Sequence, residues 1–332
     1  MALPAETRTP AAGELPPLGR QGPATFLALI GVVWFAVCVY VIARWVTSAE
    51  DFAPAPKIGP DVMEDWRLIA LRVFEAISLA VMAAFVWYCV VQPLRQTGKL
   101  GLDGKFVIGG LICFVADAFL NVQQYLFAWN SENVNRGVWV RFLPFHSPDA
   151  PTRYAESLIW GPPMYIYFCA GVAIVACHEA ERVRRRWPSM SKFQLFVCIF
   201  IFEFLFDFIV ENVVIRTTHA YAFAKTYEPL TLWAGEVHQF PIYESILVAF
   251  VGCVFTWARM EASEARPERP IGQSPIEVGV DRWRPSLQPH VRNFAVLGFC
   301  MVTLVFVYHL PFNWLGLIGT SVADMPSYLL PG

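Results

Sequence analysis

The chain has 332 residues, of which 56% are hydrophobic and only 16% are charged, and its net charge is −2. Soluble domains carry about 25% charged residues, so this composition excludes an ordinary soluble protein. Hydrophobic runs close to the membrane-spanning length of about 20 residues recur along the chain. They predict an all-α, polytopic transmembrane helix bundle of about seven spans, with six or eight left open. The predicted spans are residues 24–46, 67–91, 106–128, 157–179, 193–215, 239–260 and 292–311.

The loops between these spans predict an orientation in the membrane. With seven spans, the side holding the N-terminus carries about twice as many Lys and Arg residues as the other. The positive-inside rule therefore places the N-terminus in the cytoplasm of a multi-pass cell-membrane protein. The basic run ERVRRRW at 181–187 fits a topology anchor in the headgroups, and we expect no nucleic-acid partner. We expect a disordered tail at 1–23, a transmembrane domain at 24–311 with a cytoplasmic loop at 261–291, and a C-terminal tail at 312–332.

Five acidic residues lie inside the predicted spans: Asp117, Glu203, Asp207, Glu211 and Glu244. Three of them follow i, i+4, i+8 spacing in the segment FEFLFDFIVEN, which places them on one helical face. An acidic side chain at bilayer depth costs about 2.5–3.5 kcal/mol on insertion scales. Their presence therefore predicts a function within the membrane.

Other polar residues are expected to converge on these acids. Asp117, Asn121 and Gln124 are spaced to share one face of the third span, while Arg72, Tyr243 and His309 come from the second, sixth and seventh spans. Under the predicted topology they lie between mid-membrane and the outer side. Two outer loops, 129–156 and 216–238, mix aromatic residues with Asn, His, Arg and Glu, as binding loops and lids do, although an aromatic interfacial belt is the alternative. This pattern predicts a polar cavity that opens outward, with acids at its floor.

Several kinds of chemistry are excluded by missing motifs. The predicted spans contain no Lys, which excludes a retinal Schiff base, and the six His residues form no HxxxH pair. A DDxxD motif, a P-loop, GxGxxG and GxSxG are also absent from the sequence. Carboxylate acid and base chemistry needs only protons, so we expect no metal and no cofactor.

The stretch from Asp117 to Asp149, DAFLNVQQYLFAWNSENVNRGVWVRFLPFHSPD, resembles the AveC-like spirocyclase family of bacterial membrane proteins. The similar elements are Asp117 with Asn121, Trp129 with Asn130, Asn135 with Gly137 and Trp139, and Pro144 with Ser147 and Pro148. The acidic helix near Asp207 and Glu211 and the segment FPIYES at 240–245 are similar too.

This resemblance implies closure of a dihydroxy-ketone polyketide, or a related lipid, to a spiroketal, with dehydration in some members. Loss of water from a hemiketal gives an oxocarbenium ion, as in glycoside hydrolysis. We expect Asp117 and Glu211 to be the principal catalytic acids, with Asp207 and Glu244 in reserve. Substrate-binding roles are expected for Asn121, Gln124, Asn130, Trp139, Arg72, Tyr243, Glu203 and His309.

Two other functions fit the same acids. A membrane cyclase or hydratase acting on a terpene or carotenoid would use them similarly. A proton-coupled small-molecule carrier would use them as a proton relay, although the chain shows no repeat of its spans and no matching pair of broken helices. Conversion of a ketodiol by membranes, as opposed to uptake alone, separates these functions. The membrane lipid is an expected partner in every case.

Overall fold

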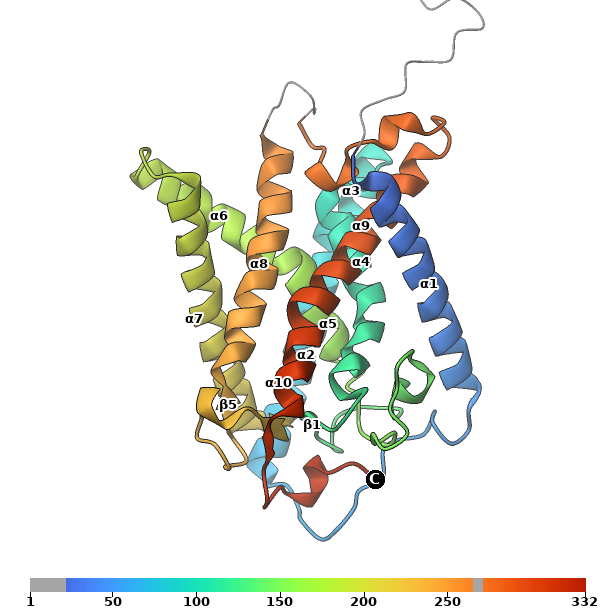
Figure 1. Ribbon diagram of the computed structural model, residues 1–332, viewed down its shortest axis with the longest axis vertical. Coiled ribbons are helices and arrows are strands. Elements are labelled where there is room, and N and C mark those ends of the chain that lie inside the picture. Colours follow the sequence, from blue (N-terminus) through green and yellow to red (C-terminus); the bar gives the residue numbers. More distant parts are fainter. Residues whose placement is uncertain (1–21, 265–270) are drawn as a thin grey trace, which may run out of the picture.

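Six long apolar helices dominate the computed structural model, which describes residues 22–264 and 271–332 (Figure 1). Three of these helices continue through a π-helical turn, where the helix widens by one residue. The six are α1 (Ala24–Thr47), α2 with η1 and α3 (Asp65–Phe85, Val86–Val91, Gln92–Thr97), α5 with η4 and α6 (Gly161–Ile166, Tyr167–Gly171, Val172–Arg186), α7 (Lys192–Thr218), α8 (Ile242–Ser263), and α9 with η8 and α10 (Gln288–Thr303, Leu304–His309, Leu310–Leu317). Each is long and apolar enough to cross a bilayer, which indicates an integral membrane protein.

The third predicted span, 106–128, takes a different form. It is the helix α4 (Leu102–Cys113), which continues as the 3-10 segment η2 (Phe114–Asn121). The helix ends where the Asn121 side chain accepts hydrogen bonds from the backbone N–H groups of Leu126 and Phe127. The expectation that Gln124 shares a helical face with Asp117 is therefore wrong, because Gln124 lies beyond the end of the helix.

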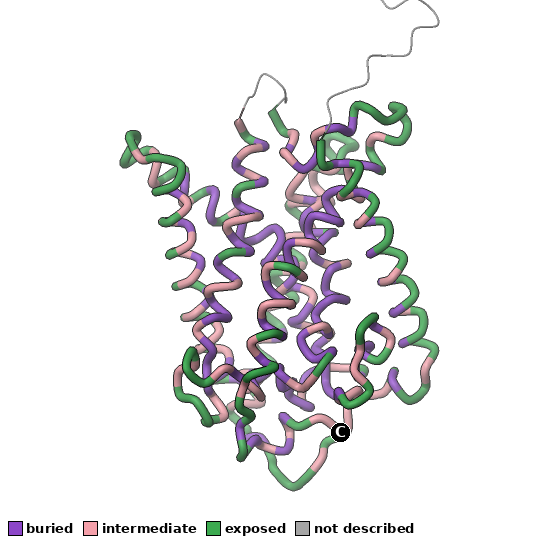
Figure 2. The backbone as a smooth tube through the Cα atoms, viewed as in Figure 1, coloured by how far each residue is buried: buried purple, intermediate pink, exposed green. Residues whose placement is uncertain are grey.

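The helices cross where small residues let their backbones meet. A Cβ atom on Gly31 of α1 would lie 2.0 Å from the carbonyl oxygen of Phe294, and one on Gly298 of α9 would lie 2.0 Å from that of Leu27. Such close approach is typical of membrane helices, which gain little from burying apolar surface against each other. Figure 2 shows buried residues concentrated in the central helices and many exposed ones on α1.

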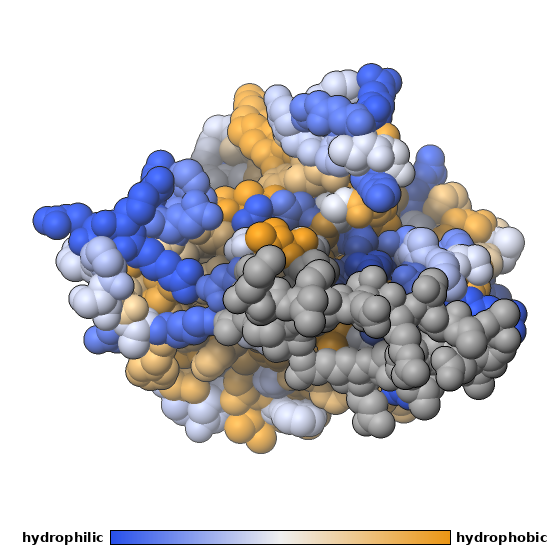
Figure 3. Space-filling view, turned by 90° about the horizontal axis from the view of Figure 1, so that it is seen from above, coloured by the Kyte–Doolittle hydropathy of each residue, from blue (hydrophilic) through white to orange (hydrophobic). Residues whose placement is uncertain are grey.

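The loops separate into two groups at opposite ends of the bundle (Figure 1). One end carries α3, the turn between α6 and α7, and the segment 271–287 with η6 (Pro275–Glu277) and η7 (Val280–Arg282). Figure 3 views this end, and its hydrophilic projection at the left is the α6–α7 turn. This grouping is the one that the distribution of Lys and Arg predicts; which end faces the cytoplasm stays a prediction.

The opposite end is built from short antiparallel strand pairs and 3-10 turns. The strand β1 (Phe127–Trp129) pairs with β2 (Tyr221–Phe223), which joins the two aromatic loops. The other elements are β3 (Lys225–Thr226) with β6 (Thr320–Ser321), β4 (Thr231–Leu232) with β5 (Phe240–Pro241), and the turns η3 (Val140–Phe142), η5 (Glu228–Leu230) and η9 (Ser327–Leu329).

The C-terminal segment is not a free tail. The segment predicted as a C-terminal tail packs on the protein, because Leu329 is fully buried and its carbonyl accepts a hydrogen bond from the Tyr125 hydroxyl at 3.0 Å. Residues 1–21 of the predicted N-terminal tail lie outside the described residues, as do residues 265–270 of the predicted cytoplasmic loop.

Candidate active site

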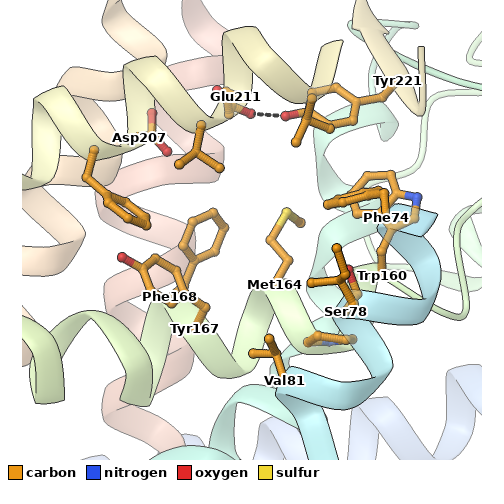
Figure 4. A pocket seen from close by; sticks show the side chains of 15 residues that line it. Phe74, Ser78, Val81, Trp160, Met164, Tyr167, Phe168, Asp207, Glu211 and Tyr221 are labelled. Carbon is orange, nitrogen blue, oxygen red and sulfur yellow. Dashed lines mark hydrogen bonds between the residues drawn. The ribbon is translucent and has the colours of Figure 1, made fainter. Parts of the chain in front are cut away.

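Two of the predicted acids line a cavity of about 250 Å³ between α2, α5 with η4, and α7. Asp207 and Glu211 come from successive turns of α7, so both face this cavity, as the i, i+4 spacing predicts. The rest of the wall is almost entirely apolar, and Figure 4 shows Phe74, Met164 and Phe168 around the open space. The helix α5 begins with Pro162 and Pro163 in its first turn, where proline costs no hydrogen bond.

Glu211 is held by one strong hydrogen bond. The Tyr221 hydroxyl, from strand β2, donates to Glu211 Oε1 at 2.5 Å (Figure 4). Within residues 22–264 and 271–332, Glu211 Oε2 and Asp207 Oδ2 have no hydrogen-bond partner. Each of the two carboxyl groups therefore has one buried oxygen without a protein partner among the described residues.

A third acid, Glu244, lies behind this wall in the first turn of α8. Tyr308 donates to Glu244 Oε1 at 2.8 Å, while Oε2 has no partner among the described residues. The Glu244 carboxyl interacts electrostatically with those of Asp207 and Glu211. Tyr308 lies in the π-helical turn η8, and such turns are frequent at functional sites.

Glu203 lies one turn before Asp207 on α7 and is fully buried. It packs against Gly252 of α8, where an added Cβ atom would lie 3.0 Å from Glu203 Cγ. Glu203 does not line the cavity, but its carboxyl interacts electrostatically with Asp207. The i, i+4, i+8 series of acids thus runs from the cavity into the α7–α8 contact.

Asp117 belongs to a second buried cluster, outside the cavity, although its carboxyl interacts electrostatically with that of Glu244. The Tyr165 hydroxyl lies 2.8 Å from Asp117 Oδ1 and 2.7 Å from His309 Nε2. A hydroxyl has one proton, so Tyr165 donates to one of these neighbours and accepts from the other. The three groups therefore have two proton arrangements, which differ by a shift along the chain of hydrogen bonds. Asp117 does not line the cavity that holds Glu211.

Sequence reasoning missed Glu156, which completes the Asp117 centre. It lies in the loop before α5 yet is fully buried, and neither of its oxygens has a hydrogen-bond partner of good geometry among the described residues. Burial, and then the neighbouring Asp117 carboxyl, raise the pKa of Glu156 well above its usual range. No periodic pattern marks a loop residue, so the sequence carried no signal for this pair.

Three of the predicted substrate-binding residues are buried and bonded to the backbone. Asn121 donates to the Phe127 carbonyl at 2.8 Å, Asn130 to the His219 carbonyl at 2.7 Å, and the Trp139 indole to the Val115 carbonyl at 2.8 Å. None of the three lines the Asp207–Glu211 cavity. Their amide and indole groups fix the loops at this end of the bundle.

The other five predicted binding residues also lie away from the cavity: Glu203 and His309, described above, and Arg72, Gln124 and Tyr243. Arg72 pairs with Glu75 at 2.5 Å, so it neutralises an acid of its own helix. The Gln124 side chain accepts a hydrogen bond from Lys225 at 2.7 Å. The Tyr243 hydroxyl accepts a weak one from the Tyr227 N–H at 3.3 Å.

The acids of the cavity and of the Asp117 centre have no cationic partner among the described residues. In the part of the chain that the structure describes, no Lys or Arg forms an ion pair with Asp117, Glu156, Glu203, Asp207, Glu211 or Glu244. Ionising all of them together in this apolar setting would be very costly, so protons must be shared among them. The same described residues contain no group of three or more His, Cys, Asp or Glu side chains arranged to hold a metal ion.

Comparison with known proteins gives one match. No curated protein and no solved structure is significantly similar to the chain. The family model described as "Spirocyclase AveC-like" matches residues 98–327, which include Asp117, Glu156, Glu203, Asp207, Glu211 and Glu244. The chain therefore belongs to the AveC-like spirocyclase family.

Proposed function

We propose that the protein closes a dihydroxy ketone to a spiroketal, with loss of one water, in the cavity between α2 and α7. Family membership implies a spiroketal-forming cyclase with a polyketide-like small-molecule substrate. The observation that carries the proposal is that Asp207 and Glu211 line one otherwise apolar cavity, and that each has one buried carboxyl oxygen without a protein partner among the described residues. Two carboxyl groups in different surroundings are the arrangement used for acid and base catalysis on acetals.

In the proposed reaction, one hydroxyl of the substrate first adds to its ketone to form a hemiketal. Protonated Asp207 then donates a proton to the hemiketal hydroxyl, which leaves as water and forms an oxocarbenium ion. Ionised Glu211 stabilises this cation and takes the proton from the second hydroxyl as it attacks. Transfer of that proton back to Asp207 restores the starting state.

The hydrogen bonds support this division of roles. Tyr221 donates its proton to Glu211, and a hydroxyl donor pairs best with an ionised acceptor. Among the described residues, Asp207 Oδ2 has no hydrogen-bond partner, and the Ser245 hydroxyl interacts with this carboxyl only outside good hydrogen-bond geometry. Glu244 interacts electrostatically with both carboxyls, which disfavours ionising all three together.

The apolar wall also favours the reaction. The rings of Phe74, Trp160 and Tyr167 line the cavity, and aromatic faces stabilise a neighbouring cation. A cavity with few polar groups does not retain the leaving water, which would otherwise reverse the step. No cofactor enters this scheme.

Asp117 has a supporting role in this proposal. It is bonded to Tyr165 of α5, whose neighbours Pro163 and Met164 line the cavity. Asp117 is thus a positioning residue that acts through α5 and does not touch the substrate.

The test is turnover of a synthetic ketodiol by the protein in lipid nanodiscs. Glu211→Gln and Asp207→Asn should slow spiroketal formation by about 10²–10⁴-fold, while Asp117→Asn should lose much less activity. Full turnover by both cavity variants would refute the assignment. Uptake of the ketodiol into vesicles without conversion would favour a carrier, and conversion of a terpene or lipid alone would favour a different cyclase.

A further inference from the structure

The end of the cavity nearest the strand pairs is closed by aromatic rings. Trp160 and Tyr221 form this wall with their ring centroids 5.3 Å apart. Behind them, Trp129 stacks on Trp160 at 4.9 Å and Phe127 stacks on Tyr221 at 4.6 Å. All four side chains are buried. A substrate therefore has no open path from the aqueous loops past strands β1 and β2.

The cavity is open instead on its flank, between α2 and α7. The rim residues are apolar and exposed: Ile77 and Val81 on α2 are 57% and 39% exposed, and Phe206 and Val210 on α7 are 37% and 42% exposed. Among the six candidate spans, α2 with its continuation and α7 have the least buried hydrophobic windows, at 17% and 22%.

The depth of this opening places it among lipid chains. Val210 lies eight residues before the end of α7 at Thr218, which corresponds to about 12 Å along the helix axis. The whole helix, at 27 residues, extends about 40 Å and so crosses the full bilayer. The rim thus lies inside the hydrocarbon layer, where an apolar opening meets acyl chains and not water.

The size of the cavity limits what it encloses. Its volume of about 250 Å³ is below the ~300–1,000 Å³ of pockets that enclose drug-sized ligands. A two-ring ketal core fits this space, but a long polyketide or lipid chain does not. The remainder of such a substrate must leave the cavity, and the flank between α2 and α7 is the open side.

We propose that the substrate is a single-chain amphiphile that enters from the lipid between α2 and α7. Its ketone and hydroxyl groups lie near one end and reach Asp207 and Glu211, while its apolar remainder stays in the opening and in the bilayer. This inference rests on the proposed function for the chemistry of the polar end. The route itself depends only on the shape and the polarity of the cavity.

A second lipid-facing cavity is an alternative binding site for the substrate, which the test must distinguish from the first. It has a volume of about 750 Å³, lies between α1 and the η8–α10 segment, and has Val33 and Phe306 among its lining residues. His309 is on its wall, but no carboxyl side chain is. Acid chemistry on a bound ketal therefore favours the smaller cavity.

Photo-crosslinking tests the route without depending on turnover. The probe is a long-chain ketodiol with a diazirine at the end of its apolar chain, added to the full-length protein in nanodiscs. We expect labelled residues on α2 and α7 around Ile77, Val81 and Val210. Labels confined to the loops 129–156 and 216–238, or to the cavity of Val33 and Phe306, would overturn the proposal.

Bulky substitutions at the rim test the placement of the chain. Val210→Trp and Ser78→Trp fill the opening, whereas Ile209→Trp and Ile69→Trp add the same indole at exposed positions outside it. For a long-chain ketodiol, kcat/KM should fall at least about tenfold in the rim variants, as overpacking predicts, and stay near wild type in the controls.

A truncated ketodiol without the apolar chain separates this inference from the proposed function. It leaves the opening empty, so the rim variants should lose less activity with it than with the long-chain ketodiol. Equal losses for long and truncated ketodiols, or no loss for either, would overturn the placement of the chain. If the wild-type protein converts no ketodiol, the proposed function fails, and the positions labelled by the diazirine probe still decide the route.

Discussion

Replacing Glu211 with glutamine removes the proposed base while changing little else. Glutamine has nearly the same shape, and its carbonyl oxygen can still accept the hydrogen bond that Tyr221 donates at 2.5 Å. The variant should therefore fold normally, with an unfolding temperature in detergent close to that of the wild type. It can neither take a proton from the attacking hydroxyl nor balance the charge of an oxocarbenium ion.

The expected size of the effect follows from these two losses. A positioned general acid or base contributes about 10²–10⁴ in rate, so kcat for Glu211→Gln should fall by about that factor. Tyr221→Phe keeps the ring that stacks on Phe127 and removes only the hydroxyl. A hydrogen bond to a charged group contributes about 1.5–3 kcal/mol, which corresponds to a loss of about 10–150-fold.

Single-turnover spiroketal formation in nanodiscs, followed by mass spectrometry, measures both variants and their combination. Because Tyr221 acts through Glu211, the double variant should be no slower than Glu211→Gln alone. Wild-type kcat in Glu211→Gln, or losses that multiply in the double variant, would refute the reasoning.

Three further predictions concern stability. Gly252→Ala places a methyl group 2.9 Å from a neighbouring side chain, so it should lower the free energy of unfolding by about 1–3 kcal/mol. Gly101→Ala has open space around its Cβ position and is the control, which should be neutral in the same thermal unfolding assay. Asn121→Ala leaves two buried backbone N–H groups without their acceptor and should cost at least about 1–3 kcal/mol; an unfolding temperature equal to that of the wild type would contradict the proposed end of the helix. The raised pKa of Glu156 means that the folded state holds its proton more tightly than the unfolded state, so stability from this group is fully present below the ordinary value of 4.5 and is lost as pH rises through the folded pKa. Glu156→Gln should therefore match the wild type in acid and exceed it in unfolding temperature at alkaline pH, and parallel pH profiles would argue against a raised pKa.

The apolar runs of the sequence predicted most of the helices, because a span that faces lipid must be apolar over its whole length. The same reasoning did not predict where the central helix α4–η2 ends. It is largely surrounded by protein, so its end is set by the Asn121 side chain and not by the edge of the hydrocarbon layer. Hydropathy alone could not locate that end.

One part of the candidate site was predictable from the sequence and another part was not. The i, i+4 spacing predicted that Asp207 and Glu211 share a surface, and both line one cavity. Asp117 was expected opposite Glu211, but it lies with Tyr165 and Glu156 in a centre of its own. Contacts of this kind join residues far apart in the chain through loop packing, which leaves no local periodicity to read.

For the aromatic loops, the sequence predicted one feature of the site and not another. Their composition favoured a lid over a simple interfacial belt, and strands β1 and β2 do bring Trp129 and Tyr221 to one end of the cavity. What composition could not reveal is the direction of the opening. That depends on which helix flanks stay uncovered, and among the described residues no other element covers the flank between α2 and α7.

The most direct test of the central claim is the incubation of the purified protein in nanodiscs with a long-chain ketodiol, followed by mass spectrometry and chiral chromatography. We expect a product that is lighter by one water, formed as a single spiroketal stereoisomer by the wild-type protein and at least about 10²-fold more slowly by Asp207→Asn. An unchanged ketodiol, or a racemic product formed equally by the wild type and by Asp207→Asn, would contradict this expectation.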